Sequence, residues 1–131
     1  MAQPDVTVLL EKASKDIRAV VALAVQDPTL TGIMAMHIQQ FIEKVIKARI
    51  LVGGGSYGFT HDLLELLGSI GDEDLVLQYG RQMAELNTYA VKIRYEGSDP
   101  PRERVVSLYA SSTALAVELF PDLDVPALRF F

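Results

Sequence analysis

The segment from Thr31 to Val52 limits the possible folds more than any other part of this chain. Apolar residues recur in it at three- and four-residue steps, which is the spacing of one face of an α-helix. Three further isoleucines widen that face, so we expect a central helix that contacts several neighbours. The apolar positions are Met34, Ile38, Phe41, Val45, Ala48 and Val52, with Ile42, Ile46 and Ile50 beside them. Asp27-Pro28 before the segment and Gly53-Gly-Gly55 after it are typical helix boundaries.

Helical spacing recurs in the rest of the chain. An amphipathic helix precedes Asp27, with Glu11, Lys12, Lys15 and Asp16 on its polar side. Thr60 predicts the N-cap of a short helix from His61 to about Ile70, and Asp72 predicts the N-cap of a longer one. A last helix ends before Pro121.

No segment shows the sustained alternation of a β-strand. The sequence therefore predicts an all-α, up-and-down bundle of four to five helices, formed by residues 1–131 as a single domain. Short connections favour antiparallel packing of sequential neighbours.

Composition excludes several classes of protein. Half of the 131 residues are apolar and 22% are charged, which suits one globular domain. The 12 basic and 17 acidic side chains give a net charge of −5, which opposes bulk DNA binding. Without cysteine there is no disulfide and no thiolate metal site. We expect no secretory signal, no membrane span and a cytoplasmic protein.

Polar residues on the central helix are the first candidates for function. Gln40, Lys44 and Lys47 follow one another at helical spacing and could present an amide and two ammonium groups to a phosphate or an acidic partner. Alternatively they belong to a solvated face on which Glu43 pairs with Lys47. His37 could act as a base or a ligand, or could hydrogen-bond a backbone carbonyl or a neighbouring helix.

A second group of candidates opens the short third helix. His61 beside Asp62 could be a histidine oriented by a carboxylate, near a helix N-terminus that attracts anions. Alternatively Thr60 and Asp62 cap the first turn, and His61 packs against the preceding helix. Two histidines alone cannot complete a zinc site, so we expect neither a metal nor a cofactor. Arg94 could bind a phosphate, or could stabilise the end of its helix as a cation.

Three blocks of sequence resemble the HEPN domain family (higher eukaryotes and prokaryotes nucleotide-binding). They are H-I-Q-Q-F-I-E-K-V-I-K at 37–47, T-H-D-L-L-E-L-L at 60–67 and N-T-Y-A-V-K-I-R-Y at 87–95. The resemblance covers residues Ile33 to Tyr95. It implies a helical up-and-down bundle, usually dimeric, often encoded beside a minimal nucleotidyltransferase as its partner, toxin or antitoxin. The positions that match the family pattern are His37, Gln40, Lys44, Lys47, His61, Asp62 and Arg94.

Some members of that family are ribonucleases, with an arginine followed four to six residues later by a histidine. Neither histidine here has an arginine at that distance, and no histidine follows Arg94. The chain therefore resembles the branch without this motif, and we assign no catalytic residue. It departs from the family pattern at Glu96, where a proline is usual, and at Arg49, in a stretch that is usually aliphatic.

The resemblance implies a homodimer that binds a nucleotide or a nucleotidyltransferase partner and does not catalyse. In that interpretation the cations Lys44, Lys47 and Arg94 neutralise phosphate, while Gln40, His37 and His61 bind the base, the sugar or a neighbouring chain. Two alternatives remain open. One is a ribonuclease or phosphotransfer enzyme that uses His61, Asp62 and Lys44. The other is a purely structural interaction module, in which the histidines set the register of the helices.

The sequence does not indicate where its C-terminal end lies. The segment from Ala127 to Phe131, with the aromatic pair Phe130-Phe131, could dock on its own bundle or on another subunit.

Overall fold

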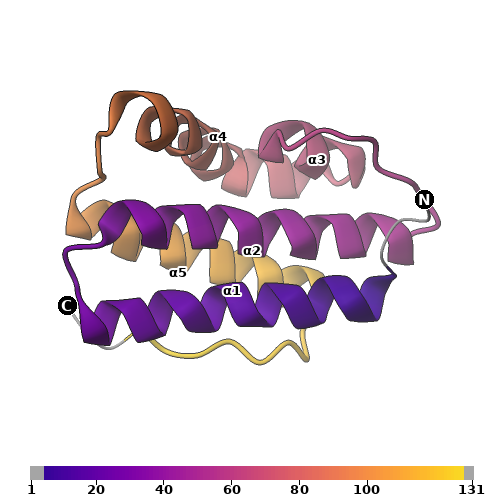
Figure 1. Cartoon of the computed structure of the whole chain (residues 1–131). Coiled ribbons are helices and arrows are strands. Elements are labelled where there is room, and N and C mark those ends of the chain that lie inside the picture. Colours follow the sequence, from indigo (N-terminus) through magenta and orange to yellow (C-terminus); the bar gives the residue numbers. More distant parts are fainter. Residues whose placement is uncertain (1–4, 129–131) are drawn as a thin grey trace.

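The computed structural model describes residues 5–128, except for the side chain of Arg94. These residues form five helices and no strand: α1 (Val6–Gln26), α2 (Thr31–Val52), α3 (Leu63–Ser69), α4 (Glu73–Glu96) and α5 (Arg102–Leu119). The long helices alternate in direction along the chain, and α3 lies beside the start of α4 (Figure 1). The predicted all-α, up-and-down bundle is confirmed. No helix in the described part of the chain has the length and hydropathy that crossing a membrane requires.

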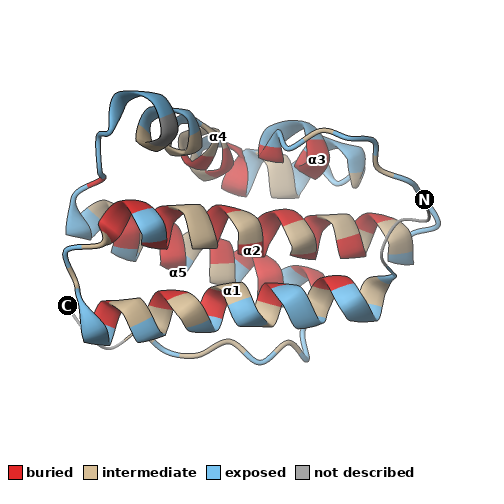
Figure 2. Ribbon diagram, in the orientation of Figure 1, coloured by how far each residue is buried: buried red, intermediate tan, exposed pale blue. Residues whose placement is uncertain are grey.

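Helix α2 lies at the centre of the bundle and contacts each of the other four helices. The buried faces of the helices meet around it (Figure 2). The predicted apolar stripe is buried from Met34 to Ala48, and Ile42, Ile46 and Ile50 are buried beside it. Val52 is the exception at 56% exposed, because it is the last residue of α2 and the chain turns away at Gly53.

The third helix begins later than the sequence predicted. It starts at Leu63, and its N-cap is Asp62, whose carboxylate accepts hydrogen bonds from the backbone of Leu64 and Glu65. Thr60 is not the N-cap, because its hydroxyl oxygen accepts a hydrogen bond from the N–H of Asp62 before the helix begins. The helix also ends at Ser69 rather than Ile70.

Helix α4 begins where the sequence predicted, and it ends at a glycine. Asp72 is its N-cap, as the sequence predicted. Gly97 ends the helix with a φ of 68°, a left-handed conformation that glycine adopts without the strain of a side chain. The turn after Gly97 leads directly into α5, which brings α4 and α5 side by side.

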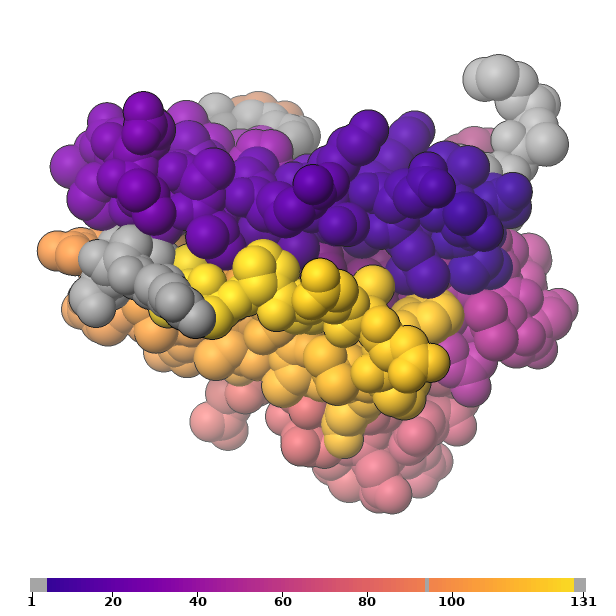
Figure 3. Space-filling model, turned by 90° about the horizontal axis from the view of Figure 1, so that it is seen from below, coloured from indigo at the N-terminus to yellow at the C-terminus, as the bar shows by residue number. Residues whose placement is uncertain are grey.

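The C-terminal segment docks on its own bundle as far as residue 128. It lies between α1 and α5 in the view from below (Figure 3). The Tyr109 hydroxyl donates a hydrogen bond to the carbonyl of Pro126, and Leu123 and Leu128 pack against the core. Phe130 and Phe131 lie outside the described residues, so their position stays an open prediction.

Candidate functional site

Two clusters of charged side chains lie on neighbouring faces of α2. We define the α1-side cluster as Asp16, His37 and Lys44. The Lys44 ammonium lies 2.5 Å from one oxygen of Asp16, and Nδ1 of His37 lies 2.9 Å from the other. The sequence placed Asp16 on an exposed face of the first helix, which is wrong. Its side chain is only 15% exposed, because that part of α1 packs against α2.

We define the α3-side cluster as Glu43, Lys47 and His61. The Glu43 carboxylate accepts from the Lys47 ammonium at 3.1 Å and lies 3.1 Å from Nδ1 of His61. The predicted Glu43–Lys47 pair is confirmed, but the predicted solvated face is wrong. The Glu43 side chain is 6% exposed and that of Lys47 is 12% exposed.

The connection between α2 and α3 covers the α3-side cluster. Tyr57 lies in this connection, and the Lys47 ammonium is 5.0 Å from the centre of its ring, within the range of a cation–π contact. Partial burial raises the pKa of the Tyr57 phenol. His61, at the end of the same connection, completes the cover by its contact with Glu43. A tertiary contact therefore buries residues that α2 alone would leave in solvent.

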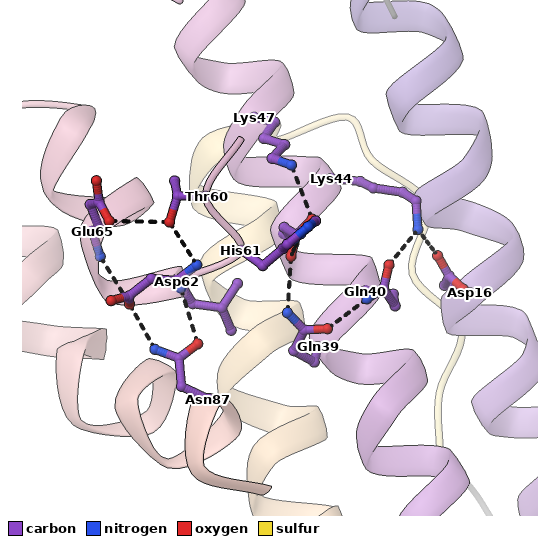
Figure 4. Close-up of polar contacts among 12 residues, drawn as sticks. Asp16, Gln39, Gln40, Lys44, Lys47, Thr60, His61, Asp62, Glu65 and Asn87 are labelled. Carbon is purple, nitrogen blue, oxygen red and sulfur yellow. Dashed lines mark hydrogen bonds and ion pairs between the residues drawn. The ribbon is translucent and has the colours of Figure 1, made fainter. Parts of the chain in front are cut away.

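Two glutamines join the clusters by a continuous chain of hydrogen bonds (Figure 4). Lys44 donates to Oε1 of Gln40, Nε2 of Gln40 donates to Oε1 of Gln39, and Nε2 of Gln39 donates to Glu43. An ammonium group can only donate and a carboxylate can only accept, so the charged ends determine the orientation of both amides. Gln39 was missed as a site residue, although its position four residues before Glu43 was a usable signal.

Asn87 of α4 holds the start of α3. Its carbonyl oxygen accepts from the Leu63 N–H at 3.1 Å, and its amide donates to Oδ1 of Asp62 at 2.8 Å. Asp62 in turn accepts from the N–H groups of Leu64 and Glu65. The N–H groups in the first turn of α3, which the sequence suggested as an anion site, are therefore bonded to protein groups. Asn87 opens the block at 87–95 that resembles the family, but its contact with Asp62 was missed, because the two residues lie 25 positions apart.

A cleft of about 430 Å³ lies beside the α3-side cluster. Its walls come from α2, from the start of α3 and from α4, and the lining residues are Gln39, Gln40, His61, Asp62, Asn87, Ala90, Val91 and Tyr95. Asn87 and Tyr95 are about 12 Å apart along α4, at a rise of about 1.5 Å per residue. The cleft therefore has a polar end near Asn87 and an apolar end near Tyr95. His61 and Tyr95 are both largely exposed.

The structure brings only some of the predicted site residues together. Gln40, His61 and Asp62 line the cleft. Lys47 is in an ion pair beside it, and Lys44 and His37 belong to the α1-side cluster. The side chain of Arg94 lies outside the described residues. Among the residues that are described, no group of three or more histidine or acidic side chains could hold a metal ion.

A family model described as the HEPN domain matches residues 6–116. The chain belongs to the HEPN domain family. The match runs from α1 into α5, so it includes both clusters and every residue that lines the cleft. HEPN domains are helical proteins of a nucleotide-binding or ribonuclease type, and they often dimerise. Neither a curated protein nor a solved structure matched the chain.

Proposed function

We propose that this chain is a non-catalytic HEPN protein that binds a nucleotide by its nucleoside part, in the cleft between α2, the start of α3 and α4. The observation that carries the proposal is the lining of the cleft, which combines three amide side chains with an exposed aromatic ring. The cleft volume of about 430 Å³ falls in the range of small-molecule sites.

The apolar end of the cleft suits a nucleobase. Tyr95 is 76% exposed, so its ring face is available for stacking. The amides of Gln39 and Gln40 each use one N–H in an internal hydrogen bond. Each NH₂ group therefore keeps a second N–H for an acceptor on the base. Stacking with a few directed hydrogen bonds is a common way to recognise a base.

The charges around the cleft argue against phosphate as the anchor. Lys44 and Lys47, which the sequence suggested for this role, are paired with Asp16 and Glu43. The N–H groups at the start of α3 have protein partners, and the Asp62 carboxylate lines the cleft. A phosphate would be repelled by that carboxylate. We therefore assign the binding free energy mainly to the nucleoside.

Calorimetric titration with the four ribonucleosides and their 5′-triphosphates tests the proposal. We expect saturable binding, with a triphosphate no tighter than its nucleoside. Tyr95→Ala should weaken binding about 5- to 150-fold through the lost stacking. Leu77→Ala is the matched control, because Leu77 is another exposed residue of α4, at 85%, and does not line the cleft. Absence of saturable binding at millimolar concentration for every nucleoside and nucleotide would contradict the proposal.

The non-catalytic part of the proposal has its own test. It is supported by the sequence, in which no arginine precedes a histidine at the ribonuclease spacing. Incubation with single-stranded RNA should give no cleavage above a blank. RNA cleavage that disappears in a folded His61→Ala variant would contradict it and would favour the ribonuclease alternative.

Association with another chain is a second candidate function. Large apolar side chains are exposed on the surface, among them Phe59 at 102% and Leu77 at 85%. Exposed apolar residues mark association where they gather in a contiguous patch. Family membership suggests a homodimer or a minimal nucleotidyltransferase partner of the toxin–antitoxin type. Light scattering should give about twice the chain mass of 14.4 kDa, and a single-chain mass at about 100 µM would contradict the homodimer.

A further inference from the structure

Arg49 lies near the end of α2 without a bonded partner. It is in the last turn of the helix, between Ala48 and the apolar residues Ile50-Leu51-Val52. Arg49 is half-buried, yet its guanidinium forms no hydrogen bond and no ion pair with any residue that the structure describes. A cation in the last turn stabilises the helix end, which accounts for the charge but leaves all five N–H donors unused.

Two hollows meet at this side chain. The smaller one, of about 80 Å³, lies between the ends of α2 and α3, and Arg49 and Ile70 line it together with Gly53. The larger one, of about 340 Å³, has Arg49 and Ile70 in its lining as well. Nη1 of Arg49 lies 3.3 Å from the place that a Cβ atom on Gly53 would take, so the guanidinium reaches the edge of the smaller hollow. The described lining of the smaller hollow contains no other charged residue.

Two carboxylates line the larger hollow, and protein contacts hold both in place. Asp72 caps α4 through one oxygen, which accepts from the N–H groups of Asp74 and Leu75. Glu118 accepts a hydrogen bond from the hydroxyl of the buried Tyr79. Within the described chain, neither carboxylate has a cation at ion-pair distance. The apolar side chains of the lining are Ile70, Leu75 and Leu119.

We infer that these two hollows together bind a free α-amino acid with an aliphatic side chain. The carboxylate of the ligand lies against Arg49, since a guanidinium can donate two parallel hydrogen bonds to a carboxylate. The ammonium group of the ligand lies in the larger hollow, where Asp72 and Glu118 accept from it. This site shares no lining residue with the cleft proposed for a nucleoside, so the inference does not depend on the proposed function.

A ligand with charge of a single sign fits the lining less well. A phosphate or a simple carboxylate would be repelled by Asp72 and Glu118, and a simple cation would be repelled by Arg49. An α-amino acid carries both charges on one carbon atom and has no net charge. Its aliphatic side chain also covers the apolar part of the larger hollow, which favours binding through the hydrophobic effect.

Calorimetric titration with leucine, isoleucine and valine tests the inference. We expect saturable binding, and the tightest ligand is then compared with its amide and with the acid that lacks its amino group. For leucine these are leucinamide and 4-methylpentanoate. Each analogue should bind at least about tenfold more weakly, because one charged group of the site loses its partner. No saturable binding of any of the three amino acids at about 10 mM, or an analogue that binds as tightly as its amino acid, would overturn the inference.

Substitutions in the site give a readout that a change in folding alone would not cause, the ratio of the affinities for the amino acid and for one analogue. Arg49→Met keeps an unbranched side chain and removes the guanidinium. The ratio of amino acid to amide affinity should fall from about 10 to about 1. Glu118→Gln keeps an acceptor for Tyr79 and removes a negative charge. The ratio of amino acid to deaminated acid affinity should fall from about 10 to below about 3.

Arg81→Met is the matched control. It makes the same change at an exposed arginine of α4 that lines neither hollow. Both ratios should stay at about 10 in this variant. A ratio that does not change in folded Arg49→Met or in folded Glu118→Gln, or that falls equally in the control, overturns the inference.

Discussion

The two clusters on α2 contain the same chemical groups and differ in what surrounds them. Each has one carboxylate that receives a lysine ammonium and a histidine Nδ1. In the α1-side cluster the carboxylate comes from another helix, so the cluster ties α1 to α2. In the α3-side cluster the carboxylate is on α2 itself and holds the connection that leads into α3. His61 of the second cluster lines the cleft described above, and no residue of the first cluster lines it.

The difference shows that two clusters with the same charged groups need not have the same function. His37 and His61 have the same kind of partner, yet His61 lines the cleft and His37 does not. We therefore assign a structural role to the α1-side cluster and a binding role to the edge of the α3-side cluster.

Glu43→Ala should have the largest effect. It leaves the Lys47 ammonium, only 12% exposed, without its carboxylate, and it frees Gln39 and His61. Removal of one partner from a buried pair costs about 3–5 kcal/mol of unfolding free energy. Urea denaturation followed by circular dichroism measures it. Glu65→Ala is the control at an exposed carboxylate. If Glu43→Ala lowers the free energy of unfolding no more than Glu65→Ala does, the burial of Glu43 does not matter for stability.

Asp16→Ala should have a smaller effect on stability and none on binding. The Lys44 side chain is 20% exposed, so its ammonium can turn toward water when the carboxylate is removed. We expect a loss of about 1–3 kcal/mol. Nucleoside affinity, measured on the folded fraction, should stay within about twofold. A tenfold loss of affinity would mean that the α1-side cluster takes part in binding.

An alkaline titration tests the contribution of two tyrosines that are buried in the bundle, Tyr79 and Tyr109. Burial raises the pKa of Tyr109 to about 12, and burial with the Glu118 carboxylate raises that of Tyr79 to about 12. The unfolded chain releases these protons near pH 10, so stability is complete below pH 10 and falls toward pH 12. Each unit of pKa difference corresponds to about 1.4 kcal/mol.

Tyr109→Phe should remove about half of this alkaline loss, because one of the two tyrosines no longer titrates. Thermal melts at pH 8, 10 and 11 measure it, with the exposed Tyr95→Phe as control. If the melting temperature of the variant falls with pH as steeply as that of the unmodified protein, Tyr109 does not contribute. Neither cluster should change its contribution in this variant.

Gln39→Met should have the smallest effect and tests whether the two clusters are coupled. It breaks the hydrogen-bond chain between the clusters while keeping a side chain of similar length. We expect a loss of about 1 kcal/mol, since Glu43 keeps its contacts with Lys47 and His61. A double-mutant cycle with Asp16→Ala measures the coupling. A coupling of zero would show that the two clusters are independent.

Much of the fold could be predicted from the sequence because its determinants are local. The apolar spacing of α2, the glycines after it and the Asp72 cap all act within one helix. The start of α3 was missed because Thr60 and Asp62 both resemble caps. The hydrogen bonds from the N–H groups of Leu64 and Glu65 to Asp62, and from the Asp62 N–H to Thr60, separate the two roles.

The candidate site could be predicted only in part. His61, Asp62 and Gln40 were indicated by their motif and do line the cleft. The burial of Glu43 and the pairing of Asp16 with Lys44 depend on which faces the neighbouring helices cover, which no local pattern contains. Asn87 was missed for the same reason, since its partners belong to α3.

Amide chemical shifts during a nucleoside titration test the division between the clusters most directly. With the best-binding ribonucleoside, we expect saturable shifts at Gln39, His61, Asn87 and Tyr95, and none at Asp16. The absence of any saturable shift, or the largest shifts around Asp16 and His37, would contradict it.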